Sequence, residues 1–191
     1  DVNSEYSIGQ SVIRIEDLLN KSHQYQMPAL GIADNNNLFA AFKFYKKAIK
    51  IGVKPIIGAT VSIRPGVSER ISKLILLCKN TTGYKNLSNL ITRSYLEGYY
   101  KDKAMVNIEW LDNQNSSGLI AISGGYNGFI QNLLLSEKSG AASKQIEKLQ
   151  LIFPEDLFLQ IQKLGGNRDV ELLEKTIEIA SLAKLPLLAA N

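Results

Sequence analysis

Asp1-Val-Asn3-Ser-Glu-Tyr-Ser7 and Pro28-Ala-Leu-Gly-Ile-Ala-Asp34-Asn-Asn-Asn-Leu-Phe39 stand near the start of a chain of 191 residues. In the second segment a short apolar run, 29–33, follows a proline and ends in a polar cluster that begins with Asp34. A run of this length, bounded by a chain-breaking residue, predicts a buried β-strand. The polar cluster is therefore expected at the carboxyl end of that strand.

Five further apolar runs of the same kind follow, and helix-like segments separate most of them. The six predicted strands are 29–33, 55–63, 73–78, 118–123, 157–161 and 186–190. Nearly continuous hydrophobic strands that alternate with amphipathic helices predict an α/β fold with a parallel sheet covered by helices. The pattern alone leaves two arrangements open, a doubly wound sheet and a closed barrel.

Three of the intervening segments carry apolar residues at three-to-four spacing, which predicts that each helix buries one face. The predicted buried positions are Ile15, Leu18 and Leu19 in the first helix, Leu38, Phe42, Tyr45 and Ile49 in the second, and Leu173, Ile177 and Ala180 in the last. Gly52 is expected to end the second helix and Asn167 to cap the last. Residues 98–117 break the alternation and are predicted to form a long excursion between two strands.

The composition is typical of one globular domain, with 45% hydrophobic residues and a net charge of +4. Basic residues are interspersed with 18 acidic ones, so the chain lacks the dense basic stripe of a nucleic-acid-binding module. The single cysteine, Cys78, lies in an apolar run, which favours a buried thiol in a reducing, cytoplasmic location. No apolar stretch approaches the roughly 20 residues that span a bilayer, so no membrane partner is expected.

The two opening segments resemble motifs of the PHP domain (polymerase and histidinol phosphatase), in the form found at the start of bacterial DNA polymerase III alpha subunits. Members typically read His-x-His-Ser-Glu-Tyr-Ser and Thr-Asp-His-Gly-Asn-Leu-Phe at these places. The resemblance continues through 54–59, 76–87, 94–100, 118–125 and 185–191. It implies a single PHP domain over 1–191, folded as a distorted seven-stranded βα barrel, at the N-terminus of a much longer polymerase chain.

In intact members the strand ends hold a cluster of up to three metal ions, and the resemblance maps the motif positions of that site onto this chain. These vestigial metal-site positions are Asp1, Asn3, Gln10, Asp34, Asn35, Thr60, Lys73 and Gly125. Asp34 matches the motif, whereas histidine, cysteine or carboxylate is replaced at the other seven. A final Asp-x-His pair is expected beyond Asn191.

These replacements predict the loss of metal binding. Zinc requires histidine, thiolate or carboxylate donors, whereas Asn, Gln and Thr offer only weak neutral oxygens. A charged Lys73 has no lone pair and brings a cation to the place of the metal cluster. Because a phosphoesterase of this type needs metal to generate hydroxide near neutral pH, we expect no catalytic residue and no cofactor in this domain.

Two readings of Asp34 remain open. It either satisfies loop amides at the end of its strand or joins Asp1 and Glu5 in a weak magnesium or manganese site. The other polar replacements are expected to hydrogen-bond to one another or to water, because buried unpaired polar groups are costly. They are Asn3, Gln10, Asn35 and Lys73.

Three other features are assigned to structure. His23 is the only histidine and matches no ligand position, so it is expected at or near the surface, which removes support for a Cys/His pair or a Ser/His/Asp triad. Residues 123–128 are rich in glycine but lack a Walker lysine, which predicts a strand-to-helix turn. The outer face of the second helix is expected to carry solvated lysines, with phosphate contact as the alternative. These are Lys43, Lys46, Lys47 and Lys50.

The resemblance implies a non-enzymatic domain of a DNA-directed DNA polymerase, whose magnesium-binding catalytic carboxylates lie in a separate palm domain. PHP domains without a metal site persist, by the same resemblance, as a scaffold for the rest of the alpha subunit and as the dock for the proofreading exonuclease subunit, epsilon. Contact with DNA is expected only through the parent polymerase.

Two alternatives stay open. The first is a residual metal-dependent phosphoesterase or 3′-5′ exonuclease, and the second is a free-standing PHP phosphatase. The polymerase-like segments 83–87 and 94–100 argue against the second alternative.

Overall fold

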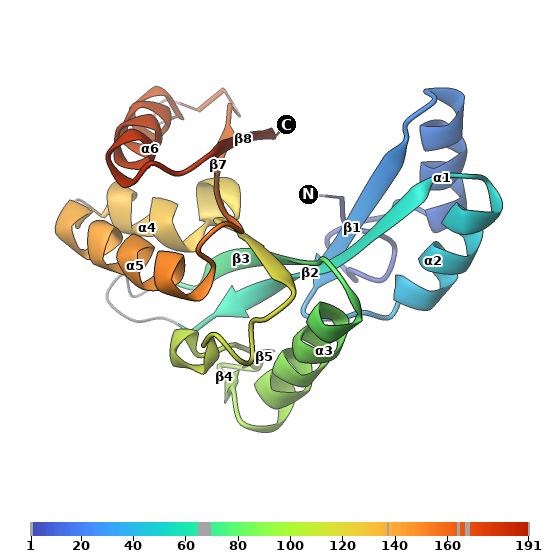
Figure 1. The fold of residues 1–191 in the computed structure, drawn as a ribbon, viewed down its shortest axis with the longest axis horizontal. Coiled ribbons are helices and arrows are strands. Elements are labelled where there is room, and N and C mark those ends of the chain that lie inside the picture. Colours follow the sequence, from blue (N-terminus) through green and yellow to red (C-terminus); the bar gives the residue numbers. More distant parts are fainter. Residues whose placement is uncertain (1, 65–69, 137, 164, 167–168, 191) are drawn as a thin grey trace.

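The computed structural model describes residues 2–64, 70–136, 138–163, 165–166 and 169–190 (Figure 1). All six predicted strands are present, with helices in most of the gaps between them. The elements in chain order are α1 (Ile15–Gln24), β1 (Ala29–Asn35), α2 (Ala41–Lys50), β2 (Lys54–Ile63), β3 (Ser72–Cys78), α3 (Thr81–Leu96), β4 (Tyr99–Tyr100), β5 (Lys103–Ala104), η1 (Ile108–Trp110), β6 (Leu119–Ile122), η2 (Gly125–Asn127), α4 (Phe129–Leu135), α5 (Ser139–Ile152), β7 (Leu157–Gln162), α6 (Asp169–Ala183) and β8 (Leu187–Ala190).

The main sheet has six strands in the order β1-β2-β3-β6-β7-β8. The β1/β2, β6/β7 and β7/β8 pairs are parallel, but β3 runs antiparallel to both β2 and β6, so the prediction of an entirely parallel sheet is wrong. Only residues 64–71 join β2 to β3. A parallel connection requires a crossover of a dozen or more residues, so this short link imposes the reversal.

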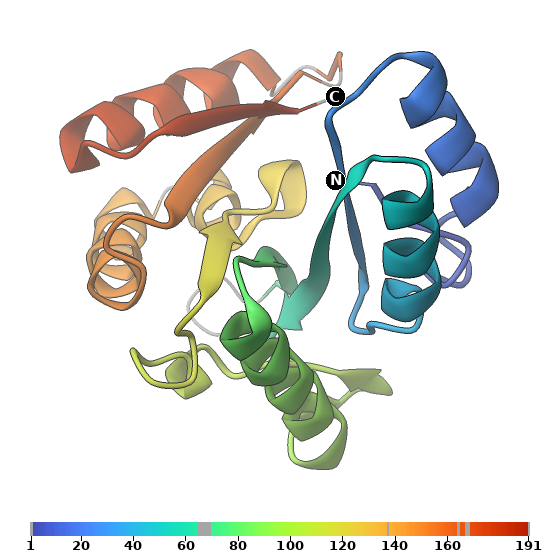
Figure 2. The same cartoon turned by 45° about the vertical axis from the view of Figure 1, so that its right-hand side comes forward.

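The sheet curls so that its two ends approach each other, and both chain termini lie near that closing edge (Figures 1 and 2). Helices surround the outer side of the curl. The α/β class is confirmed, and the arrangement is a curled half-barrel of six strands rather than a flat doubly wound sheet. The expected count of seven strands is not reached within the described residues.

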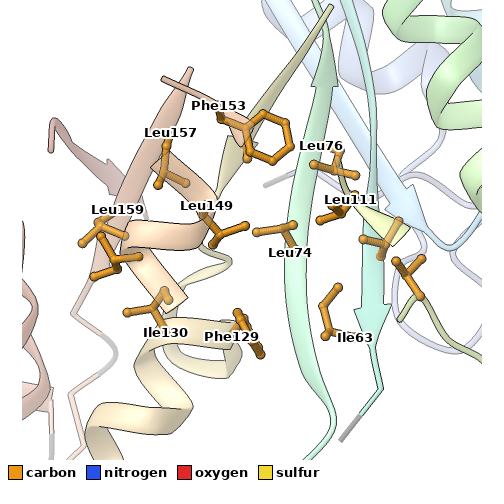
Figure 3. Packing of buried hydrophobic residues seen from close by; sticks show 14 of the residues in the cluster. Ile63, Leu74, Leu76, Leu111, Phe129, Ile130, Leu149, Phe153, Leu157 and Leu159 are labelled. Atoms are coloured by element: carbon orange, nitrogen blue, oxygen red, sulfur yellow. The ribbon is translucent and has the colours of Figure 1, made fainter. Parts of the chain in front are cut away.

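Most of the core lies between the outer side of the sheet and the helices. Leu74 and Leu76 of β3 pack with α4, α5 and β7 through residues such as Ile130 and Phe153 (Figure 3). Each fully buried side chain of this kind contributes roughly 1.5–3 kcal/mol. The inner side of the curl holds a smaller cluster built around Ile75. The larger outer cluster therefore holds the half-barrel together.

The buried face of α2 differs from the predicted one. The helix buries Ala41, Phe44 and Ala48 against β1 and α1, whereas Phe42 and Tyr45 remain 78% and 52% exposed. Ile49, also predicted to be buried, is exposed as well, and Leu38 is half-buried against the main core. Two adjacent rows of α2 are apolar at helical spacing, and the sheet covers only one of them. The small alanines allow that row to approach the sheet closely.

The other helix predictions are largely confirmed. In α1, Ile15 and Leu19 are buried and Leu18 packs against their cluster. Gly52 follows the end of α2 with a φ of +77°, a conformation that favours glycine. In α6 the predicted face is displaced: Ala180 is buried and Leu173 half-buried, but Ile177 is 43% exposed while its neighbour Thr176 is buried. Asn167 lies outside the described residues.

The predicted excursion at 98–117 contains the β4/β5 hairpin and the short helix η1. The Arg93 guanidinium lies 4.2 Å from the centre of the Trp110 ring and ties the excursion to α3. Cys78, at the end of β3, is half-buried, and its burial raises the pKa of the thiol to about 11. Within the described part of the chain, no helix has the length and apolar character required to cross a bilayer.

Candidate functional site: a polar cluster at the strand ends

The reversal of β3 brings together residues that are far apart in sequence. The first residues of β3 lie level with the last residues of its neighbours, so Lys73 pairs with Ser62 near the end of β2 and bridges to Gly128. Asn35, the last residue of β1, pairs with Thr60. These strand ends form the edge at which the sequence predicts the vestigial metal site.

The Asp34 carboxylate is hydrogen-bonded by other residues of the chain. Its Oδ1 atom accepts hydrogen bonds from the Ser4 backbone N–H and the Ser7 hydroxyl, both at 2.6 Å, and Oδ2 accepts one from the Ser4 hydroxyl at 2.7 Å. The carboxylate is 2% exposed. This geometry supports the reading of Asp34 as a loop-satisfying residue. Ser4 and Ser7 were missed as its partners, although both stand in the opening segment.

Lys73 and Asn35 lie together on the inner side of the curl. The Lys73 ammonium donates a long, weak hydrogen bond of 3.4 Å to Asn35 Oδ1. Burial lowers the pKa of Lys73, because desolvation disfavours the charged form. The contact fits the expectation that the polar replacements bond to one another. Asn35 Nδ2 and Asn3 Oδ1, however, are buried and find no partner among the described residues.

Two other predicted positions are also occupied by internal contacts. Thr60 donates its hydroxyl hydrogen to the Ala33 carbonyl oxygen at 3.0 Å and is 1% exposed. Gly125 has a φ of +60°, and a Cβ atom there would lie 2.3 Å from Gln162 Oε1. The Gln162 side chain thus fills the space beside Gly125 and accepts a hydrogen bond from the Tyr126 backbone N–H at 3.2 Å.

A separate buried hydrogen-bond network, missed in the sequence, lies close to Gln162 and includes the backbone of Gln160 in β7. Ser123 Oγ accepts hydrogen bonds from Gln131 Nε2 at 2.8 Å and from the Gln160 backbone N–H at 2.9 Å. Gln131 Nε2 also donates to the Gln160 carbonyl oxygen at 3.1 Å. The alternation of Gln160 and Gln162 on a strand predicts only that their side chains point to the same side of the sheet. It does not predict this network, because Gln160 takes part through its backbone, while Gln131 Oε1 and Gln160 Oε1 are buried without a partner among the described residues.

The residues present do not fit a metal cluster. Within the described ranges, no group of three or more His, Cys, Asp or Glu side chains is placed to hold an ion. Glu5, one arm of the alternative magnesium or manganese site, forms an ion pair with Lys43 at 3.2 Å, and Asp34 is saturated. Asp1 lies outside the described residues. Gln10 is exposed and stays apart from the buried cluster.

The assignments of His23 and of residues 123–128 agree with the structure, and the prediction of solvated lysines on α2 is confirmed in part. His23 is exposed on α1. Residues 123–128 form a turn from β6 to α4 in which Gly124 has a φ of +84°. On α2, Lys43 and Lys47 pair with Glu5 and Glu16, and the hydrogen bond to Glu5 raises the pKa of Lys43. The other two lysines of the helix, Lys46 and Lys50, are exposed.

Comparison with known proteins connects this geometry to a family. The chain is 34% identical over 192 residues to DNA polymerase III subunit alpha of Buchnera aphidicola from Acyrthosiphon pisum, covering 100% of this chain and 16% of that protein. It is 32% identical over 191 residues to the same subunit of Vibrio cholerae, again covering 100% of this chain and 16% of that protein. The chain thus spans about one sixth of these relatives, and its resemblance to them extends over its full length.

Two solved structures share the fold at 10% sequence identity. An amidohydrolase from Chromobacterium violaceum with bound sulfate and no metal has a TM-score of 0.56 over 97% of this chain and 84% of its own. A proposed metal-dependent phosphoesterase from Bifidobacterium adolescentis has a TM-score of 0.51 over 94% and 82%. The model of the PHP domain matches residues 1–163. That match covers most of the chain, so the protein belongs to the PHP domain family.

Proposed function

We propose that this chain, over residues 1–191, is the PHP domain of a DNA polymerase III alpha subunit, and that it acts there as a structural and protein-docking domain without hydrolase activity of its own. Its similarity to alpha subunits along the full chain supports the parent protein. The single observation that carries the inactive role is the saturation of Asp34 by Ser4 and Ser7. A carboxylate with three internal donors has little capacity left for a metal.

The chemistry of the other strand-end groups supports the same proposal. Metal-dependent hydrolysis of a phosphoester requires an ion that lowers the pKa of bound water and neutralises developing charge. Amides, a backbone-bonded hydroxyl and a glycine cannot replace histidine and carboxylate ligands. The Lys73 ammonium adds a positive charge that repels a divalent ion. The cluster is therefore suited to filling space at the strand ends rather than to catalysis.

The proposed partners follow from this role. The rest of the alpha subunit packs against the domain, and the proofreading exonuclease subunit docks on it. DNA and magnesium are bound by other parts of the parent polymerase and not by this domain. The buried core allows the domain to present a fixed surface for such contacts without an active site.

The inactive role is tested on the purified alpha subunit. Bound zinc is counted by elemental analysis after dialysis, and hydrolysis of p-nitrophenyl phosphate is measured with zinc, manganese and magnesium. We expect less than one zinc ion per chain and hydrolysis at the buffer background. Asp34→Ala serves as the matched variant and should leave that background unchanged. Stoichiometric zinc, with hydrolysis that Asp34→Ala abolishes, would instead establish a residual phosphoesterase.

A further inference from the structure

An apolar groove of about 440 Å³ lies on the outer surface between α2, β2 and the start of α3. Phe42 and Tyr45 of α2 form one wall, Pro55 and Ile57 of β2 contribute the floor, and Tyr84 of α3 stands opposite. The groove lies away from the strand-end polar cluster and is therefore a separate site.

The wall formed by α2 is unusually exposed. Phe42 is 78% exposed, and Ile49, two helical turns farther along the same row, is 55% exposed. Tyr84 across the groove is 41% exposed. Single exposed apolar residues are ordinary, but large exposed ones that line a concavity, as Phe42, Tyr45 and Tyr84 do, are typical of a protein-binding surface. This row is the face of α2 that sequence periodicity predicts to be buried.

The charges beside the row are uncompensated. Lys46 and Lys50 occupy the neighbouring row of α2, and among the described residues neither has a carboxylate within ion-pair distance. Lys43 and Lys47, one row farther round, are paired with acidic residues of the N-terminal segment and of α1. Exposed Lys54 precedes Pro55 of the groove floor. The surface therefore combines bulky apolar side chains with a positive rim.

Within the groove itself the charge is already balanced. Lys79 is bound by both carboxylate oxygens of Asp156, at 2.8 and 2.9 Å. The unbalanced positive charge thus lies along the α2 edge, where a bound segment would lie beside Lys46 and Lys50. Electrostatic complementarity at such an edge favours a negatively charged partner and accelerates its association.

A second surface hollow, beside α5, makes a useful contrast. Leu151 is 76% exposed there, but it is the only large apolar side chain of that hollow with high exposure in the described chain. Asp112 and Lys148 both line this hollow, so it carries charges of both signs. It therefore lacks both the apolar row and the positive edge of the α2 groove.

We propose that the α2 groove binds an acidic segment of the exonuclease subunit, with bulky apolar side chains of that segment seated against Phe42, Tyr45 and Tyr84 and its carboxylates beside Lys46 and Lys50. This inference rests on the proposed docking function and names the surface that performs it. Aromatic side chains of this kind typically supply most of the binding free energy at an interface, and rim charges supply rate and selectivity.

The test uses the full alpha subunit and the purified exonuclease subunit, with association and dissociation followed by surface plasmon resonance. Phe42→Ser combined with Tyr45→Ser should weaken binding by about 30-fold, the loss typical of an interface hot spot. Lys46→Glu combined with Lys50→Glu should slow association by about tenfold at low salt, and the difference should shrink as salt rises. Leu151→Ser and Lys144→Glu, at other exposed positions, should change binding less than about twofold.

Circular dichroism melting checks that each variant folds, which we expect because the replaced side chains are exposed. Wild-type affinity in both groove variants would overturn the inference while leaving the docking function intact. Failure of the wild-type alpha subunit to bind the exonuclease would overturn both. Loss of alpha self-association in the groove variants would also overturn the inference, because the occupant would then be a second copy of the chain. Loss of stability only in the full alpha subunit would overturn it as well, because the occupant would then be another part of the parent chain.

Discussion

In most proteins polar side chains are exposed and apolar ones are buried, and the strand-end polar cluster and the α2 groove each depart from this distribution. At the strand ends, polar groups are buried and the chain itself satisfies most of them, as Asp34 shows. At the groove, apolar groups are exposed and none of the described chain covers them, as Phe42 shows. The strand-end carboxylate is thus satisfied by the chain, although Asn3 Oδ1 and Asn35 Nδ2 find no partner among the described residues, whereas the groove is the surface that we propose a partner covers.

The largest difference should appear between neighbouring residues of α2. Phe44 is 0% exposed, so Phe44→Ala should lower the free energy of unfolding by about 3–5 kcal/mol through lost burial and a cavity. Phe42→Ala should change it by less than about 0.5 kcal/mol. Urea unfolding followed by circular dichroism measures both. Equal losses would show that Phe42 is part of the core.

The next largest effect concerns the saturated carboxylate. Asp34→Ala leaves the Ser4 N–H and two hydroxyl groups buried without an acceptor, and should cost about 2–4 kcal/mol. Asp156→Ala removes an exposed ion pair with Lys79 and should cost less than about 1 kcal/mol. The same urea titration distinguishes them. A negligible effect of Asp34→Ala would mean that the strand-end cluster does not depend on this residue.

A smaller effect of opposite sign is expected at Lys73. Burial lowers its pKa below the ordinary 10.5, so the folded state disfavours the charged form and Lys73→Met should raise the free energy of unfolding at neutral pH by less than about 1 kcal/mol. Between the folded and unfolded pKa values the unfolded chain binds more protons, so wild-type stability rises with pH there. The advantage of Lys73→Met should therefore shrink as pH approaches 10.5, as urea unfolding at several pH values would show. Destabilisation by Lys73→Met would instead reveal that the ammonium group supports the cluster.

The smallest effect is a change in reactivity without a change in fold. Cys78 lines the α2 groove, and burial raises the pKa of its thiol to about 11. At pH 8 only about one thiol in a thousand is ionised, so alkylation by iodoacetamide should be slow and should accelerate about tenfold per pH unit. Mass spectrometry measures the rate, and a bound partner should slow it further. Rapid labelling at neutral pH, relative to a free cysteine peptide, would contradict this picture.

The strands could be predicted because each is a short apolar run bounded by polar or chain-breaking residues. Their directions could not, since hydrophobicity is the same read in either direction, and the reversal of β3 depends on the length of the link before it. The buried face of α2 was missed because two adjacent rows are apolar. Only tertiary packing selects the row that contains Phe44.

The candidate site, like the fold, could be predicted only in part. The sequence located Asp34 at a strand end, because the apolar run before it is a local signal. It left open whether loop groups or a metal would satisfy the carboxylate, since its partners Ser4 and Ser7 lie 30 and 27 positions away in the chain. The filling of the space beside Gly125 by Gln162 could not be foreseen. That contact joins residues 36 positions apart or more and depends on the curl of the sheet.

The reversal of β3 also bears on the order in which the chain folds. β2 and β3 pair across a short link, so their ribbon closes at a small cost in chain entropy, whereas each parallel pair must wait for an intervening helix. We expect this ribbon to form first. Substitutions at Val61 and Leu74, which face each other across it, should therefore give folding φ-values near 1, meaning that their contacts are already formed in the folding transition state. β1 and β6 then add to its two edges. The β2/β3 ribbon, which carries Lys73, is thus expected to be the nucleus from which the half-barrel grows.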